Sequence, residues 1–410
     1  SIAAAAVLSL TGLLFAESLV ARDRLFAQAP SALAAAVPFA AGAGLVAAGT
    51  TSTTILFGGL YLLSTALVLA SAAALLRVRP GTSRRTRTLQ AAAAVLAGVV
   101  LASVNEIVYL APPLVLAAVV IRGRVVLGRP WREVLTGSSA RLAGWLWLGF
   151  LPVFALTRAL IYGHCRDGGC YRGSDLALGV DALAALPNRM VSWLPPLMWH
   201  SATRGGYGWL VGALPLLALI VLGLLARGAL RDLPRLTPVA RAGALGLAAL
   251  AGVLLLLGAS LAALNGDVQA LAARGRLGQG WRDTGITALA GGLVVVGLVA
   301  AVLARARRRR GWYATVVVLL ALCAVGSTAA NQRFQQVTSR GARMMLANEI
   351  AGEMADFDRS PAGNLRRCEL RREFVALHPD APFSYRRFDV SLNLAAVERE
   401  GMPFCAEAAS

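Results

Sequence analysis

Glu106 is the residue whose type and position most favour chemistry. It falls between two long apolar runs, next to Asn105 and about one helical turn before Tyr109. An ionisable group at the edge of a membrane-length apolar run is costly, so such a carboxylate is a functional candidate. It could act as a general base or accept a substrate hydroxyl in a cavity at the outer leaflet. The structural alternative is an interfacial helix cap or an ion pair with Arg158.

A second group of polar residues lies in the long loop 163–206 and in the loop 265–284. Carboxylates there could accept sugar hydroxyls, and arginines could pair with a phosphate. Trp193 and Trp199 add aromatic rings, which suit a lipid phosphate or a sugar face but equally suit an ordinary aromatic belt. The arginines of 265–284 are alternatively solvated surface charge. The predicted substrate-binding residues are Asp175, Asp181, Arg189, His200, Arg204 and Arg282.

The element that would carry two of these residues, Asp175 and Asp181, is an amphipathic helix. Ser174 followed by Asp175 is typical of a helix start, and Leu176, Val180 and Leu183 recur on one side. Pro187 is expected to end it. We therefore predict a capped helix at 174–187 that lies on the outer surface of the membrane.

The five cysteines divide by region: two lie in the loop 163–206, two lie near the C-terminus, and Cys323 falls in an apolar run. Even numbers in regions predicted to be extracytoplasmic favour two disulfides, Cys165–Cys170 and Cys368–Cys405. Free thiols remain an alternative. A metal site with His164 is another, although the spacing matches no common zinc pattern.

The composition identifies the elements that must position these residues. Of 410 residues, 57% are hydrophobic and 15% are charged, whereas soluble chains carry roughly 25% charged residues. This predicts an all-α polytopic membrane protein. About ten transmembrane helices are expected, near 1–19, 31–49, 53–76, 89–104, 106–121, 142–162, 208–226, 242–264, 285–304 and 312–330.

The arginines predict the orientation of these spans. All 40 basic residues are Arg, and they fall in short clusters between apolar runs, which argues against nucleic acid as the partner despite the net charge of +19. One set of alternate loops holds 21 arginines and the other holds seven. Because cytoplasmic loops are enriched in positive charge, we expect a multi-pass plasma-membrane protein whose C-terminus is extracytoplasmic.

The composition changes after residue 330. The last eighty residues hold eleven Arg and eleven acidic residues, so this tail is neutral. We predict a transmembrane domain at 1–330 and a small extracytoplasmic module at 331–410, with helices near 339–357 and 364–377. One helix would bury Ala342, Met345, Leu346, Ile350 and Met354, and the other Leu365, Cys368, Leu370 and Phe374. A module this small usually needs a covalent staple.

This layout resembles the GT-C superfamily of membrane glycosyltransferases, especially the Arg- and Ala-rich versions of actinobacteria. The resemblance is carried by the many spans, the short outer turn 49–54, the surface helix at 174–187 and the small outer module. The tail from Asn364 to Cys405 also looks like the C-terminal segment of actinobacterial polytopic proteins. The resemblance implies transfer of a sugar from a polyprenyl-phosphate donor to an outer acceptor.

In that family a carboxylate in the first outer loop acts in catalysis. Here the first span runs as the family's second span does, so we expect that loop to precede Ser1, and its residue cannot be assigned. The alternatives to a glycosyltransferase are a transporter or flippase of a lipid-linked or anionic substrate, and a non-catalytic subunit that anchors partner proteins through the tail. Membrane lipids are expected partners in each case. No cofactor is identified, and a divalent metal is left open.

Overall fold

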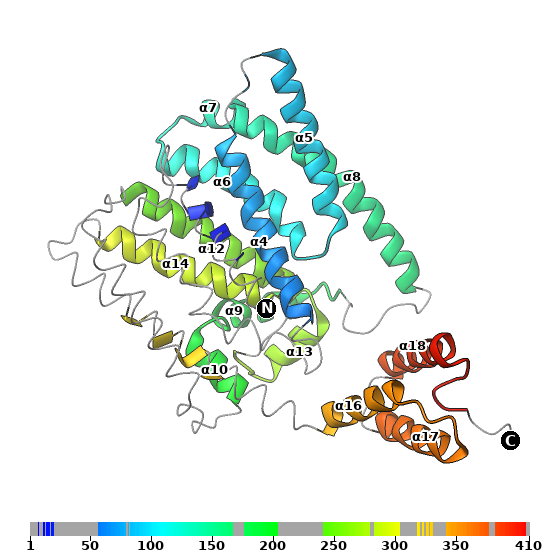
Figure 1. The fold of residues 1–410 in the computed structure, drawn as a ribbon. Coiled ribbons are helices and arrows are strands. Elements are labelled where there is room, and N and C mark those ends of the chain that lie inside the picture. Colours follow the sequence, from blue (N-terminus) through cyan, green and yellow to red (C-terminus); the bar gives the residue numbers. More distant parts are fainter. Residues whose placement is uncertain are drawn as a thin grey trace. The chain divides into compact units, whose positions relative to one another are not determined.

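The computed structural model describes residues 56–78, 81, 83–166, 176–203, 241–278, 283–303, 342–376 and 382–406, with single residues and short stretches in 7–19 and 318–330. This described part is almost entirely helical, as predicted, and it contains no named strand. The chain divides into two compact units, one holding the helices from α4 to α14 and the other holding α16 to α18 (Figure 1).

Six described helices are long and apolar enough to cross a membrane. Four predicted spans, 1–19, 31–49, 208–226 and 312–330, lie wholly or mostly outside the described residues. The membrane-length helical stretches are α4 (Leu56–Arg77), α5 (Arg84–Ser103), η1 with α6 and the π-turn η2 (Val108–Leu110, Ala111–Ile121 and Arg122–Val126), α8 (Ser138–Arg166), α12 (Arg241–Ala263) and α14 (Thr284–Leu303). The short helices between them are α7 (Trp131–Thr136), α9 (Val180–Val191), α10 (Pro195–Thr203) and α13 (Gly266–Ala273).

Two helix pairs pack most extensively in the first unit: α5 with α8, and α12 with α14. The α5–α8 crossing is close because a glycine stands on each side. A Cβ on Gly98 would lie 2.1 Å from the carbonyl oxygen of Leu146, and a Cβ on Gly149 would lie 2.1 Å from that of Val95. Small residues of this kind let helix backbones approach in membranes.

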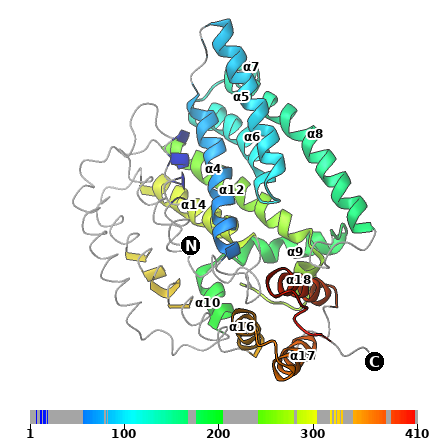
Figure 2. The same ribbon diagram turned by 45° about the vertical axis from the view of Figure 1, so that its right-hand side comes forward.

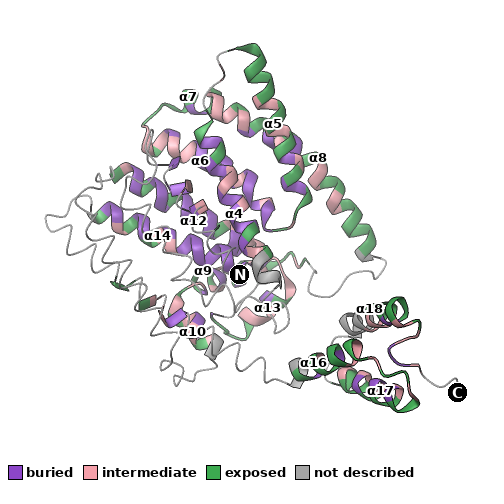
Figure 3. Cartoon of the chain, in the orientation of Figure 1, coloured by how far each residue is buried: buried purple, intermediate pink, exposed green. Residues whose placement is uncertain are grey.

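The segment 89–121 contains α5 and α6, and these two helices pack mainly against other helices rather than against each other. After α5 ends, the chain turns at Asn105, and α6 packs against α4, α8 and α12, while α5 packs along α8 (Figure 2). Figure 3 shows the resulting distribution of burial: α4, α6, α12 and α14 carry most of the buried residues, while α5 and α8 are largely exposed.

The predicted surface helix at 174–187 is wrong at both ends. The structure places Ala177 to Gly179 outside any helix, because the Ala177 amide donates to the Leu264 carbonyl (2.9 Å) and Leu176 forms an antiparallel bridge with Asn265. Helix α9 therefore begins at Val180 and continues through Pro187 to Val191. Asn188 and Arg189 in its last turn bond to the Arg276 carbonyl and to Asp283. These partners are distant in sequence, so the local residue pattern does not indicate them.

The second unit is a helical module of α16 (Ala342–Ala355), α17 (Pro361–Ala376) and α18 (Pro382–Glu400). The first two match the predicted helices within a few residues, and α18 was not predicted. Leu346, Ile350, Leu370, Ala396 and Phe404 form the core. The predicted Met345 and Leu365 are instead exposed, at 53% and 67%.

Candidate functional site

The turn that carries Glu106 is fixed by Asn105. The Asn105 side-chain oxygen accepts hydrogen bonds from the amides of Ile107 (3.0 Å) and Val108 (3.3 Å), and its amide donates to Ser64 Oγ on α4 at 2.5 Å. The Asn105 side chain therefore orders the turn that precedes η1, as Asn side chains do by bonding backbone amides two and three residues on. Glu106 is the next residue in this turn.

Glu106 forms an ion pair with Arg158 of α8. The distance from Arg158 Nη1 to Glu106 Oε1 is 3.5 Å, and the Arg158 and Glu106 side chains are 26% and 47% exposed respectively. The Arg158 guanidinium also lies over the rings of Tyr109, at 4.9 Å, and Phe154, at 5.8 Å. These four residues are here called the Glu106 site. The ion pair is one of the two structural alternatives expected from the sequence.

The Glu106 site combines groups suited to a sugar phosphate. Tyr109 and Phe154 pack edge to face with their centroids 5.1 Å apart, so the rings beneath Arg158 are held in place. A guanidinium pairs well with phosphate, and a carboxylate accepts hydroxyl protons. Because both charged groups are partly exposed, their mutual attraction is screened, and a ligand can compete for each of them.

Arg189, a predicted phosphate ligand, is instead buried in an ion pair. Its Nη2 lies 2.7 Å from Asp283 Oδ1 and its Nε lies 3.3 Å from Oδ2, and the two side chains are only 4% and 2% exposed. A guanidinium that is bound in this two-point way and closed off from solvent is not available to a phosphate. Arg189 thus connects α9 to the start of α14.

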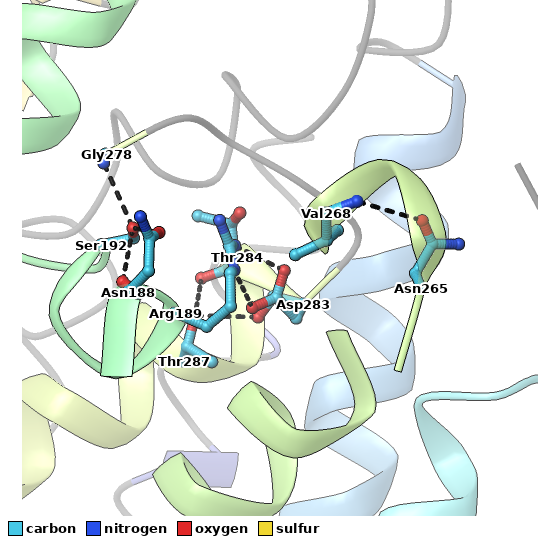
Figure 4. A network of polar contacts seen from close by, with 9 residues as sticks. All are labelled: Asn188, Arg189, Ser192, Asn265, Val268, Gly278, Asp283, Thr284 and Thr287. Atoms are coloured by element: carbon cyan, nitrogen blue, oxygen red, sulfur yellow. Dashed lines mark hydrogen bonds and ion pairs between the residues drawn. The ribbon is translucent and has the colours of Figure 1, made fainter. Parts of the chain in front are cut away.

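Figure 4 shows how the surrounding polar groups complete this connection. The Asp283 carbonyl accepts from the Ile286 and Thr287 amides (3.0 and 2.9 Å), so this residue also caps α14. Ser192 Oγ donates to the Asn188 carbonyl and accepts from the Gly278 amide. The described parts of the two loops that the sequence singled out for substrate binding therefore contact each other here, through the Arg189–Asp283 ion pair and the Gly278–Ser192 hydrogen bond.

The remaining predicted site residues divide into two groups. Asp181, in the first turn of α9, and His200, on α10, are exposed. Asp175, Arg204, Arg282, Cys170 and the side chain of Cys165 lie outside the described residues. In the described part of the chain, no three His, Cys, Asp or Glu side chains form a group that could hold a metal ion.

The two tryptophans of the α9–α10 region pack against other helices. A Cβ on Gly291 of α14 would lie 2.2 Å from the Trp193 ring, so the ring occupies the space that this glycine leaves. The Trp199 indole donates to Ser327 Oγ at 3.0 Å. Both rings are partly buried, which makes them packing residues rather than a free platform for a sugar.

The Cys368–Cys405 disulfide is present, as predicted. It joins α17 to the segment that follows α18, and Asn364 holds the same segment by reciprocal hydrogen bonds with Ala406, each 2.9 Å. Sequence reasoning missed Arg367, which is fully buried. Its guanidinium lies 3.9 Å from the centroid of Phe357 and donates to the Phe404 and Asp358 carbonyls.

Comparison with known proteins identifies no relative: no protein-family model, curated protein or solved structure matches this chain.

Proposed function

We propose that this chain is a multi-pass membrane glycosyltransferase that uses a lipid-linked sugar at the outer face of the membrane. The observation that supports it best is the Glu106 site, where a partly exposed carboxylate stands 3.5 Å from a guanidinium stacked over two aromatic rings. The site lies at a turn between membrane-length helices, and we propose that the lipid-linked donor presents its phosphate and sugar there.

The proposed reaction follows from the two charged groups. Glu106 accepts the proton of an acceptor hydroxyl, whose oxygen attacks the anomeric carbon of the sugar. The bond from that carbon to the phosphate oxygen breaks, and the phosphate leaves with the electron pair. Arg158 pairs with the negative charge of the phosphate, and the weak Glu106–Arg158 pair opens to admit it. The resemblance to GT-C enzymes gives the same substrate class.

The test uses the purified full chain in lipid nanodiscs with a panel of radiolabelled polyprenyl-phosphate pentoses and hexoses. We expect Glu106→Gln to lower sugar transfer by about 10²-fold or more, as for loss of a general base, with donor binding retained. Arg158→Gln should weaken donor binding instead. Glu133→Gln and Arg132→Gln, exposed residues of α7, are the matched controls.

Two results would contradict this proposal. One is wild-type transfer by Glu106→Gln, which would leave the carboxylate with a structural role only. The other is the absence of transfer from every donor of the panel by the wild-type protein together with no donor binding.

A second candidate function, a membrane subunit that anchors partner proteins, is favoured by one feature of α18. Val390, Leu394 and Val397 lie at helical spacing and are about half exposed, at 50%, 60% and 48%. A photo-crosslinker at position 394 should then give one defined adduct with a co-purifying protein. A transporter is less well supported: a path along α14 would need open space beside its glycines, and the Trp193 ring fills the space that Gly291 leaves.

A further inference from the structure

The segment 176–194 exposes an apolar stripe and buries Arg189, while Asp181, next to Val180, is exposed. In α9, the exposed positions Val180, Ala184, Pro187 and Val191 recur at helical spacing, with Leu183 beside them at 72% exposure. Arg189 and Ala185 lie on the opposite, buried side. Leu176 and Leu178, just before the helix, are also exposed, at 63% and 81%.

This distribution is the reverse of that of a surface helix in water. A water-facing helix presents charged and polar groups outward and buries its apolar stripe. Here the buried guanidinium is matched by the Asp283 carboxylate, so the polar side is satisfied within the protein. The outward apolar stripe has no such partner among the described residues and is exposed at the surface of the protein.

Two contacts fix the depth of this segment relative to the spans. At one end, Leu176 bridges Asn265 and Ala177 bonds Leu264, directly after α12 ends. At the other end, Arg189 pairs with Asp283, directly before α14 begins. Because α12 and α14 pack along each other and 264–283 connects them, both contacts lie at the same end of this helix pair.

The chain then continues along the spans rather than away from them. Trp193 packs on Gly291, which is seven residues into α14; at 1.5 Å per residue this is about 10 Å from the helix start. The segment therefore begins at the ends of α12 and α14 and reaches the depth of their apolar side chains.

We propose that the segment 176–194 is embedded in one leaflet of the bilayer, with lipid acyl chains covering Leu176, Leu178, Val180, Leu183 and Val191. The Arg189–Asp283 pair anchors it to α14 from the protein side. Lipid is the occupant that the depth dictates, because the stripe is continuous with the ends of two membrane-length helices. This inference rests on the membrane-embedded part of the proposed function and not on sugar transfer.

Spin labels can test this directly in nanodiscs of phosphatidylcholine and phosphatidylglycerol. Single cysteines replace Val180, Leu183 or Leu178 in a full-length background with Cys165→Ser, Cys170→Ser and Cys323→Ser, which keeps the tail disulfide. Leu156→Cys on the exposed side of α8 is the lipid reference, and Met345→Cys on the tail is the water reference. Because the labelled residues are exposed, the substitutions remove no packing.

We expect labels at 178, 180 and 183 to collide more often with dissolved oxygen than with a polar nickel chelate, as the label at 156 does. A preference for the nickel chelate, as at 345, would overturn the proposal by placing the stripe in water. Protection from both reagents would also overturn it, since another protein surface would then cover the stripe. These readouts do not depend on enzymatic activity, so failure of the transfer assay and failure of this proposal are distinguished.

Discussion

At the scale of single residues, burial separates two ion pairs with the same chemistry. Glu106 and Arg158 are partly exposed, and Arg158 Nη1 lies 3.5 Å from Glu106 Oε1. Arg189 and Asp283 are almost fully buried and meet at two points. The first pair is open to solvent on both sides, whereas the second joins α9 to the start of α14 and is closed off from solvent.

Removing one member of the buried pair leaves an uncompensated charge. We expect Arg189→Ala to destabilise the protein by about 3–5 kcal/mol, measured as a fall in the thermal unfolding midpoint in detergent. Glu106→Gln should cost less than about 1 kcal/mol, because its pair is partly exposed. The double variant Arg189→Met, Asp283→Leu should recover much of the loss. Equal effects of the Arg189→Ala and Glu106→Gln variants would contradict this difference.

Asp358 gives the tail a predictable response to pH. The Ser360 amide and hydroxyl donate to its carboxylate at 2.8 Å each, which lowers the pKa of Asp358 below the ordinary value of 3.8. Its stabilising contribution is therefore complete above pH 3.8 and is lost as the pH falls through the lowered pKa. Hydrogen exchange at the start of α17 should be faster in Asp358→Asn than in wild type near neutral pH. That difference should vanish in acid, and a difference that grew in acid would contradict the assignment.

At the scale of elements, glycines decide how closely helices cross. Gly98→Val and Gly149→Val should each disrupt the α5–α8 pair, because the new Cβ would meet a backbone carbonyl at 2.1 Å. A Cβ on Gly144, also on α8, would instead have no neighbouring atom within 4 Å. Gly144→Ala should be neutral or stabilising by up to about 1 kcal/mol. Thermal unfolding midpoints compare the three variants, and tolerance of both valines would contradict the close crossing.

The stability of the tail module depends on its covalent link. The Cys368–Cys405 disulfide spans 37 residues, for which the chain-entropy relation gives about 4 kcal/mol of stabilisation. We expect Cys405→Ser to make α17 and α18 sensitive to limited proteolysis while the membrane-length helices stay protected. Leu365→Ser, at an exposed position of α17, is the control. Unchanged protease resistance of Cys405→Ser would show that the noncovalent contacts suffice.

At the scale of the whole molecule, the arginine distribution predicts the orientation. We expect alkaline phosphatase fused after residue 410 to be active in cells, and a green fluorescent protein fused there to stay dark. Insertions at Gly81, between α4 and α5, should give the opposite pair of signals. An active phosphatase at position 81 together with an inactive one at 410 would reverse the predicted orientation.

Local features of the amino-acid sequence are enough to predict the class of structure. Membrane-length helices, the helical tail and the Cys368–Cys405 disulfide follow from local properties: apolar runs, a change of composition and cysteine parity. These properties are local because hydrocarbon thickness sets span length and helical periodicity sets which residues share a face. The ends of most described spans therefore fall within a few residues of the predicted ones.

The partners of the polar residues, in contrast, follow from the folded structure and not from local sequence patterns. Asp283 lies 94 positions from Arg189, and nothing in the spacing of either residue indicates the other. The start of α9 depends on Leu264 and Asn265, and the burial of Arg367 depends on carbonyls at 358 and 404. Contacts between residues distant in sequence set these features, because a buried charge is tolerated only where the folded chain brings acceptors or a counter-ion to it.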